Sequence, residues 1–249
     1  MLIDSHCHIL SCEYDNLDEI LKKCLLKVDK IIINGYDFKT SVEAVDIANK
    51  YKNVYAAVGI GPEEVDNVSL SNFKDIERLL NNEKVVAIGE IGLDYYWTKE
   101  NKEKQIYVFK NMLNIAKQNN KPVIVHSRES INDVYNLLKE YGVKGIMHCY
   151  SGSYEMAKEF IKLGFLIGIG GVVTFKNAKT IKDVVRKIDI SNISLETDSP
   201  YLSPEPKRGE KNDSTNLIYI VENISKIKNI TTKEVIEKTG KSVSSMFKL

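Results

Sequence analysis

The sequence predicts an α/β fold, because short apolar runs alternate with longer amphipathic stretches along its 249 residues. Eight runs have the length and composition of β-strands, and a helical pattern follows each of them. Parallel strands joined by right-handed helical crossovers produce this alternation. Eight such units favour a closed (β/α)8 TIM barrel over an open doubly wound sheet, which is the other arrangement that the pattern allows.

The expected strands are apolar on both faces, as is typical of buried parallel strands. Thr231-Thr-Lys-Glu234 forms a capping box and predicts a last helix that ends near Phe247. The expected strands are Leu2–His6, Lys30–Asn34, Val54–Ile60, Val85–Glu90, Pro122–His126, Gly145–His148, Phe165–Gly170 and Ile193–Asp198. The expected helices are Leu17–Leu26, Thr40–Tyr51, Leu70–Leu80, Lys102–Asn119, Ile131–Tyr141, Tyr154–Leu163, Ala178–Ile188 and Ser214–Lys228.

Composition predicts a single globular domain over residues 1–249, since no Gly/Ser-rich linker or low-complexity tract divides the chain. No stretch approaches the roughly 18 apolar residues of a membrane span. The net charge of +1 disfavours a long basic nucleic-acid track but leaves room for a local phosphate site. The four cysteines form no CxxC pair and the N-terminus has no signal-peptide pattern, so we expect a cytoplasmic protein. We also expect it to be monomeric or weakly associating.

All four histidines and two acidic residues fall at, or just past, the C-terminal ends of expected strands. In a parallel barrel these ends lie on one face, which is where such enzymes keep their sites. One histidine in such a place is more often a satisfied, partly buried residue, but six ligand-type residues in equivalent places indicate a metal site. The six are His6, His8, Glu90, His126, His148 and Asp198.

Strand alternation decides which neighbouring side chains can share a metal. His6 and His8 lie on one face of an extended strand and Cys7 on the other, and the same alternation turns Cys149 away from His148. Both cysteines are therefore expected to be packing residues. Six nitrogen and oxygen ligands suit two divalent ions about 3.5–4 Å apart, bridged by a carboxylate. Zn, Mn, Fe and Mg are all compatible with this mixture of ligands.

Five sequence blocks carry a family resemblance, and they extend in order from residue 2 to about residue 228. They are Asp4-Ser-His-Cys-His8, Gly89-Glu-Ile-Gly-Leu-Asp-Tyr95, Pro122-Val-Ile-Val-His-Ser-Arg128, His148-Cys-Tyr-Ser-Gly-Ser153 and Glu196-Thr-Asp-Ser-Pro-Tyr-Leu-Ser-Pro204. They resemble the signature blocks of the TatD-related deoxyribonucleases, a branch of the metal-dependent amidohydrolase superfamily. The resemblance implies a TIM barrel and a divalent-metal phosphodiesterase that trims single-stranded or damaged DNA from a 3′ end.

The resemblance also implies a role for each ligand-type residue. It implies that His6 and His8 hold one ion, that His126 and His148 hold the second, that Glu90 bridges the two, and that Asp198 binds metal and acts on the nucleophilic water.

The chain departs from the family pattern in three places. Leu10 stands where an Asp or Asn is frequent. Gly61 and Glu63 stand where a Gly-Ile-His-Pro-His segment commonly directs two histidines into the substrate cleft. The segment Glu129-Ser-Ile-Asn-Asp133 drifts mildly from the family pattern. These departures concern substrate contacts, whereas the metal-ligand set is complete.

The residues themselves predict how the chemistry would proceed. A water on a divalent ion loses its proton near neutral pH and becomes a hydroxide nucleophile. Asp198 can accept that proton, with Glu90 as the second catalytic carboxylate. Arg128, two residues after His126, offers a bidentate fork for a phosphate, although a role as a surface salt-bridge or helix-start residue is an equal alternative. Arg208 is the second candidate substrate contact, because the family has a similar Arg-Gly segment; a solvated basic loop is its alternative.

Aromatic residues follow the Glu90 block directly. Tyr95, Tyr96 and Trp97 can stack on bases or pack the loop onto the barrel, and packing is favoured for at least one of them. Asp94 is expected to orient a metal ligand or to cap a turn.

Two other functions stay open. The same site would hydrolyse a carbonyl ester or amide, such as a D-aminoacyl-tRNA, because the same hydroxide attacks a carbonyl carbon. The near-neutral charge and the missing cleft histidines leave room for this alternative. A non-catalytic metal-bound scaffold is the second alternative, and the complete ligand set argues against it.

Overall fold

The computed structural model describes all residues from 1 to 249. Its eight strands form one sheet in the chain order β1 to β8. A helix follows each strand, which is the element order of the predicted (β/α)8 barrel. The strands are β1 (Ile3–Cys7), β2 (Lys30–Asn34), β3 (Val54–Val58), β4 (Val85–Asp94), β5 (Val123–Arg128), β6 (Gly145–Met147), β7 (Phe165–Ile169) and β8 (Ile193–Leu195).

The helices agree with the predicted ones to within a few residues at each end. None of them is both long and apolar enough to span a membrane. They are α1 (Leu17–Leu25), α2 (Phe38–Lys50), α3 (Leu70–Leu79), α4 (Lys102–Gln118), α5 (Ile131–Tyr141), α6 (Tyr154–Lys162), α7 (Lys179–Lys187), α8 (Leu217–Lys228) and α9 (Thr232–Phe247). Four short 3-10 helices are added: η1 (Pro62–Asn67), η2 (Gly171–Thr174), η3 (Ile190–Asn192) and η4 (Ser214–Asn216).

The chain forms two compact units. The first unit comprises Met1–Ile33, Cys149–Lys162 and Leu166–Leu249, and the second unit comprises Asn34–His148 and Leu163–Phe165. A single domain over the whole chain stays a prediction.

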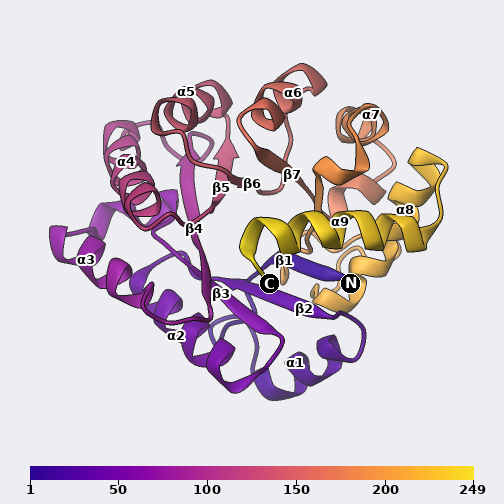
Figure 1. The fold of residues 1–249 in the computed structure, drawn as a ribbon, viewed down its shortest axis with the longest axis horizontal. Coiled ribbons are helices and arrows are strands. Elements are labelled where there is room, and N and C mark those ends of the chain that lie inside the picture. Colours follow the sequence, from indigo (N-terminus) through magenta and orange to yellow (C-terminus); the bar gives the residue numbers. More distant parts are fainter. The chain divides into compact units, whose positions relative to one another are not determined.

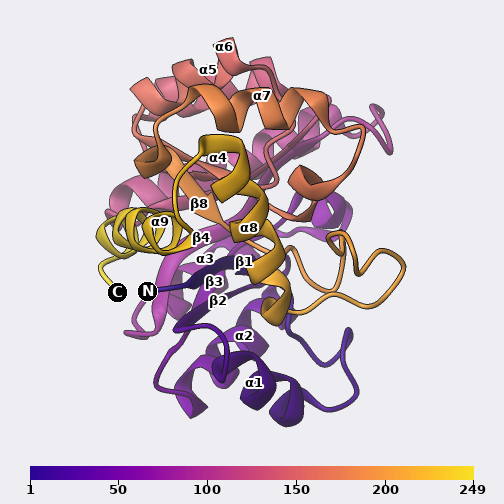
Figure 2. The same ribbon diagram turned by 90° about the vertical axis from the view of Figure 1, so that its right-hand side faces the viewer.

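In the first unit, α9 packs on α8 and on the strands β1 and β8 (Figures 1 and 2). Its predicted capping box is present, with Thr231 accepting from the backbone N–H of Glu234. Gly240 lies where a side chain would collide with the chain's first residue, since a Cβ atom there would be 2.0 Å from the carbonyl oxygen of Met1. This close approach holds the C-terminal helix against the N-terminal strand.

In the second unit, helices α2 and α4 pack on the strands β3 and β4 (Figure 1). An Asp37–Thr40 capping box starts α2. The buried face of α4 includes Val108, Phe109 and Met112, and burying such side chains supplies most of the stability of a helix of this kind.

Strand β4 differs from its prediction, because it continues past Glu90 to Asp94. Its register with β5 shifts between Ile88 and Ile91, and then resumes with Gly92 opposite His126. Such an irregularity re-aims a side chain while the strand continues. Glu90 therefore lies inside an irregular stretch of the strand and not at its end.

A register shift also occurs in β1. Its pairing with β2 shifts between Asp4 and Cys7, and this stretch contains His6. By contrast, no shift interrupts the pairing of β5 with β6 or of β7 with β8. A further shift interrupts the pairing of β3 with β4 between Ala56 and Ala57, where no ligand-type residue lies, so irregular pairing is not confined to the stretches around His6 and Glu90.

Candidate metal centre

Three ligand-type side chains converge in the first unit, at the end of β1 and shortly after β8; we call His6, His8 and Asp198 the first trio. The Nε2 atoms of the two histidines are 3.0 Å apart. The Asp198 Oδ1 atom lies 3.5 Å from Nε2 of His6 and 3.7 Å from Nε2 of His8. Two imidazole nitrogens and a carboxylate oxygen so close together are a donor set for a divalent cation.

Backbone hydrogen bonds fix the first trio. The N–H of Asp198 donates to the carbonyl of His6 at 3.0 Å, and the N–H of His8 donates to the carbonyl of Ser199 at 2.7 Å. Asp198 has a φ of 56°, in the left-handed region that Asp adopts more readily than bulky residues do. Cys7 turns away from the trio and its Sγ donates to the carbonyl of Ile32. Burial raises the pKa of this thiol, so it is a packing residue.

Asp4 is fully buried, and its carboxylate accepts from the N–H of His6 at 3.4 Å. Its Oδ2 accepts from the Thr197 hydroxyl at 2.6 Å, and its Oδ1 accepts from the Thr197 N–H at 3.0 Å. Burial raises its pKa to about 7, against the opposing effect of these hydrogen bonds. Asp4 therefore ties β1 to the segment that carries Asp198. We did not predict this function for Asp4, because its partner is 193 residues away.

The second unit contains another group, Glu90, His126 and His148, which we call the second trio. One ligand atom from each lies within 4.8 Å of the others. Nδ1 of His126 is 3.0 Å from Oε1 of Glu90, and the rings of His126 and His148 are 6.2 Å apart. The side chains extend from the neighbouring parallel strands β4 and β5 and from the residue after β6.

Asp94 holds the other side of the His126 ring, with its Oδ2 3.0 Å from Nε2. Burial lowers the pKa of His126, but the hydrogen bonds with Asp94 and Glu90 outweigh it and raise this pKa to about 9. Gln105 of α4 in turn fixes Asp94 with two 2.8 Å backbone hydrogen bonds. A carboxylate on one ring nitrogen commonly orients the other one toward a metal. Asp94 also accepts from the N–H of Tyr96, so its two oxygen atoms contact the His126 ring and the turn that follows β4.

Two residues close to Asp198 in the sequence have different surroundings. Glu196 is buried and its Oε1 accepts from the N–H of Cys149 at 2.5 Å, which is a structural hydrogen bond. Tyr201 is a neighbour that the sequence patterns did not single out. Its ring centroid lies 6.3 Å from that of His8, and the residue is 52% exposed. The sequence signal that could have identified Tyr201 is the presence of an aromatic residue three positions after Asp198.

The two arginines expected to contact substrate are both exposed and stacked on aromatic rings. Arg128 lies 3.6 Å above the ring centroid of Tyr96. Arg208 lies 3.9 Å from the ring centroid of Phe175. Neither forms a salt bridge, so the salt-bridge alternative for Arg128 is absent.

Each departure from the family pattern has a structural setting. Leu10 is fully buried, which suits an apolar residue. Gly61 precedes η1, and a Cβ atom there would meet Tyr36 at an ordinary 3.5 Å. Glu63 is exposed in η1, directly after β3.

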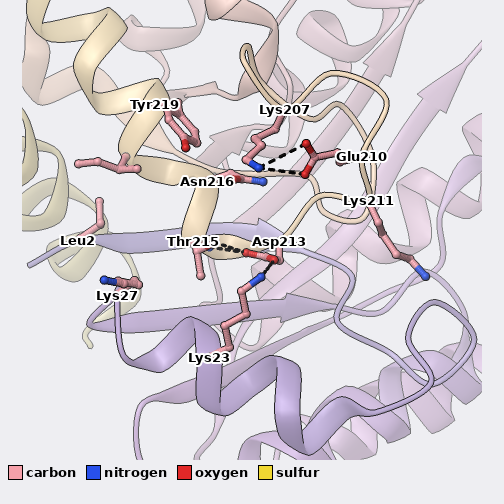
Figure 3. Close-up of a pocket in the computed structure, with 11 residues that line it drawn as sticks. Leu2, Lys23, Lys27, Lys207, Glu210, Lys211, Asp213, Thr215, Asn216 and Tyr219 are labelled. Carbon is pink, nitrogen blue, oxygen red and sulfur yellow. Dashed lines mark hydrogen bonds and ion pairs between the residues drawn. The ribbon is translucent and has the colours of Figure 1, made fainter.

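The loop after β8 contributes to a cavity of about 570 Å³ in the first unit (Figure 3). Lys23 is paired with Asp213 at 2.6 Å, and Lys207 with Glu210 at 3.1 Å (Figure 3). Lys211 donates to the carbonyl of Glu13. Since internal partners engage these lysines and no member of the first trio lines the cavity, we place it outside the candidate metal centre.

Both trios fit divalent cations by their donor chemistry. Each combines imidazole nitrogens with a carboxylate. Zn, Mn and Fe accept such mixed ligands, and Mg prefers the oxygen atoms among them. The chain thus has clusters able to bind a metal in both units.

The fold and these clusters define a metal-dependent hydrolase with a (β/α)8 fold, and comparison with known proteins supports this class. The model of the TatD related DNase family matches residues 3–248. The chain is 39% identical to the metal-dependent hydrolase YabD of Bacillus subtilis, with both chains covered completely. It is 35% identical to the metal-dependent hydrolase MJ1582 of Methanocaldococcus jannaschii, covering 99% of this chain and 96% of the relative. The chain belongs to the TatD-related DNase family.

Solved structures agree. The crystal structure of YjjV, a TatD homologue from Escherichia coli, superimposes with a TM-score of 0.91 at 26% identity, covering 100% of this chain and 98% of that one. The phosphotriesterase homology protein of Escherichia coli, solved with phosphate in its active site, shares the fold at a TM-score of 0.70 and 16% identity, covering 99% and 98%. The predicted fold class and family resemblance are both confirmed.

Proposed function

We propose that the two trios bind the two divalent ions that the sequence predicts, and that the protein hydrolyses phosphodiester bonds in DNA, from the 3′ end of single-stranded or damaged strands. The observation that carries this proposal is the second trio, in which Glu90, His126 and His148 gather at or just beyond neighbouring parallel strands. Ligands of (β/α)8 enzymes gather at the C-terminal ends of the strands. The residues of the first trio likewise lie at or after the ends of β1 and β8.

Two bound divalent ions would neutralise a phosphate and activate a water for attack. Within the chain, His6 and His8 would bind one ion, His126 and His148 the other, and Glu90 would bridge them. Asp198, which is 13% exposed at its side chain, is open enough to accept a proton from an attacking water. Arg128 and Arg208 keep their N–H edges available for phosphate oxygens.

The test is a panel of metals and substrates. Metal-stripped protein is supplied with Mg²⁺, Mn²⁺ or Zn²⁺ and incubated with single-stranded DNA, duplex DNA, RNA, simple esters and aminoacyl-tRNA. We expect shortening of single-stranded DNA from its 3′ end. Loss of this activity in Asp198→Asn, with retention in Asp183→Asn at a partly exposed site on α7, would support the assignment. No cleavage with any metal, or a His6→Ala variant as active as wild type, would refute it.

The same panel separates the alternatives. Preferential hydrolysis of a D-aminoacyl-tRNA or another carbonyl ester would indicate an esterase in place of a nuclease. The exposed Glu63, which stands in place of a cleft histidine, is compatible with this alternative. Metal binding without any hydrolysis would indicate a scaffold. We further propose a monomer in the cytoplasm, to be checked by light scattering and by cell fractionation.

A further inference from the structure

The segment that follows β4 exposes two aromatic side chains beside the second trio. Tyr95 packs inward, 6% exposed, and its hydroxyl donates to Asp133 at 2.9 Å. Tyr96 and Trp97 are 51% and 66% exposed, and their rings meet edge to face at a centroid distance of 4.9 Å. Packing therefore explains Tyr95 but leaves the other two rings facing solvent.

Arg128, the last residue of β5, completes this group. Its guanidinium lies 3.6 Å from the ring centroid of Tyr96 and 5.3 Å from that of Trp97. The chain has four arginines, and two of them, Arg78 and Arg186, pair with an aspartate on their own helix. Arg128 makes no salt bridge, so its face is held by aromatic rings while its N–H edge is available for a ligand.

A shared carboxylate joins this group to the candidate metal centre. Oδ1 of Asp94 accepts from the N–H of Tyr96 at 2.9 Å, while Oδ2 lies 3.0 Å from Nε2 of His126. In addition, Asp94 and Arg128 are paired residues of the neighbouring strands β4 and β5. A ligand on these rings would therefore lie next to His126 of the second trio.

We infer that Tyr96, Trp97 and Arg128 form a nucleotide-binding platform for single-stranded nucleic acid. The Arg128 N–H edge binds a phosphate of the strand, and the exposed ring of Trp97, supported by Tyr96, stacks on a neighbouring base. Stacking on aromatic side chains needs an unpaired base and tolerates any base, so the platform selects single strands without selecting sequence. This inference rests on the proposed function, since it names how that site would take its substrate.

Trp97 is the only tryptophan of the chain, so its fluorescence reports directly on the platform. Metal-stripped protein is titrated with a short single-stranded oligodeoxynucleotide, and in parallel with an abasic oligomer of the same length and with inorganic phosphate. We expect saturable quenching by the normal oligomer, at least about 10-fold weaker affinity for the abasic one, and no quenching by phosphate. Equal affinity for the normal and abasic oligomers would overturn the inference.

Variants give a second test, by fluorescence anisotropy of a labelled oligomer. Trp97→Ala and Arg128→Gln should each weaken binding by about 5-fold or more. Tyr107→Ala is the matched control, because Tyr107 is a tyrosine of α4 with a similar 50% exposure, and it should bind as wild type does. In metal-loaded enzyme the Trp97→Ala change should raise KM and leave kcat within about 2-fold, since stacking binds substrate and transition state alike.

The two proposals fail separately. Quenching and base-dependent binding without any DNA cleavage would support the nucleotide-binding platform and refute the proposed nuclease activity. Cleavage of DNA with unchanged Trp97 fluorescence, and with a wild-type KM in Trp97→Ala, would keep the nuclease and overturn the platform.

Discussion

Asp94 and His126 are joined by a 3.0 Å contact between Oδ2 and Nε2, and this contact leaves Nδ1 of His126 facing Glu90. The imidazole therefore has a carboxylate on each side. A cation bound by the second trio would compete for Nδ1, while Asp94 would keep the Nε2 proton in place. The strength of metal binding should thus depend on a residue that does not touch the metal.

The variant Asp94→Asn tests this dependence. Its amide nitrogen would face Nε2 of His126, which favours the tautomer that carries its proton on Nδ1 and cannot bind a metal there. We expect metal affinity to fall by about 10- to 100-fold. Isothermal titration of metal-stripped protein measures this. Asp133→Asn, a partly exposed aspartate that pairs with Lys102, is the control and should bind metal as wild type does. Equal affinities in both variants would show that Asp94 does not orient His126.

Local patterns explain why much of the fold was predictable. Apolar runs, helix periodicity and the Thr231 capping box act over a few residues, so strand order and most helix bounds follow from them. The extension of β4 to Asp94 was not predictable, because it depends on a register shift against β5. The 3-10 helix η4 likewise takes the first turn that was expected in α8.

The candidate site was predictable to a similar degree. Ligand-type residues could be found because strand ends are visible in the sequence. The residues that contact these ligands or their neighbours could not be found in this way. Asp4 contacts Thr197, and Arg128 contacts Tyr96, only in the folded chain. Apolar burial at Leu10 also needed the structure, because the family pattern alone suggested an acid there.

Gly92 provides a test of how tightly β4 and β5 are fitted at the second trio. It has a φ of +147°, and a Cβ atom there would lie 2.0 Å from the carbonyl oxygen of His126. Gly92→Ala must therefore displace β5 at His126, and we expect a loss of about 1–3 kcal/mol or more in the free energy of unfolding, together with weaker metal binding. Chemical denaturation and metal titration measure the two effects.

Gly142→Ala is the control for the backbone effect alone. This glycine ends α5 with a φ of +68°, and a Cβ atom there would have nothing within 4 Å of it. The variant should lose about 1 kcal/mol because of the left-handed conformation, and it should bind metal normally. If both variants bind metal equally well, the close fit at His126 is not what positions that ligand.

Asp4 should make the stability of the metal-free protein depend on pH. Its pKa is about 7 in the folded protein and near 3.8 in the unfolded chain, so unfolding releases a proton between these values. The contribution of protonated Asp4 is fully present below about pH 4 and is lost as the pH rises through 7, up to about 4 kcal/mol. Urea unfolding of wild type and Asp4→Asn from pH 4 to pH 8 measures it. The difference between the two should fall steadily with rising pH, and a constant difference would contradict this pKa.

Glu63 lies in η1 directly after β3, where the family commonly has a cleft histidine. Burial raises the pKa of the neighbouring Glu64, and the nearby acids Asp37 and Glu63 raise it further, so the region is negatively charged. Such charge repels a phosphate backbone. Glu63→His should lower KM for single-stranded DNA by about 2- to 5-fold at low salt, with the effect fading as salt is added. Glu103→His on the exposed face of α4 makes the same charge change and should leave KM unaltered. If Glu63→His weakens DNA cleavage and strengthens ester hydrolysis, the acidic residue belongs to a site for a less charged substrate.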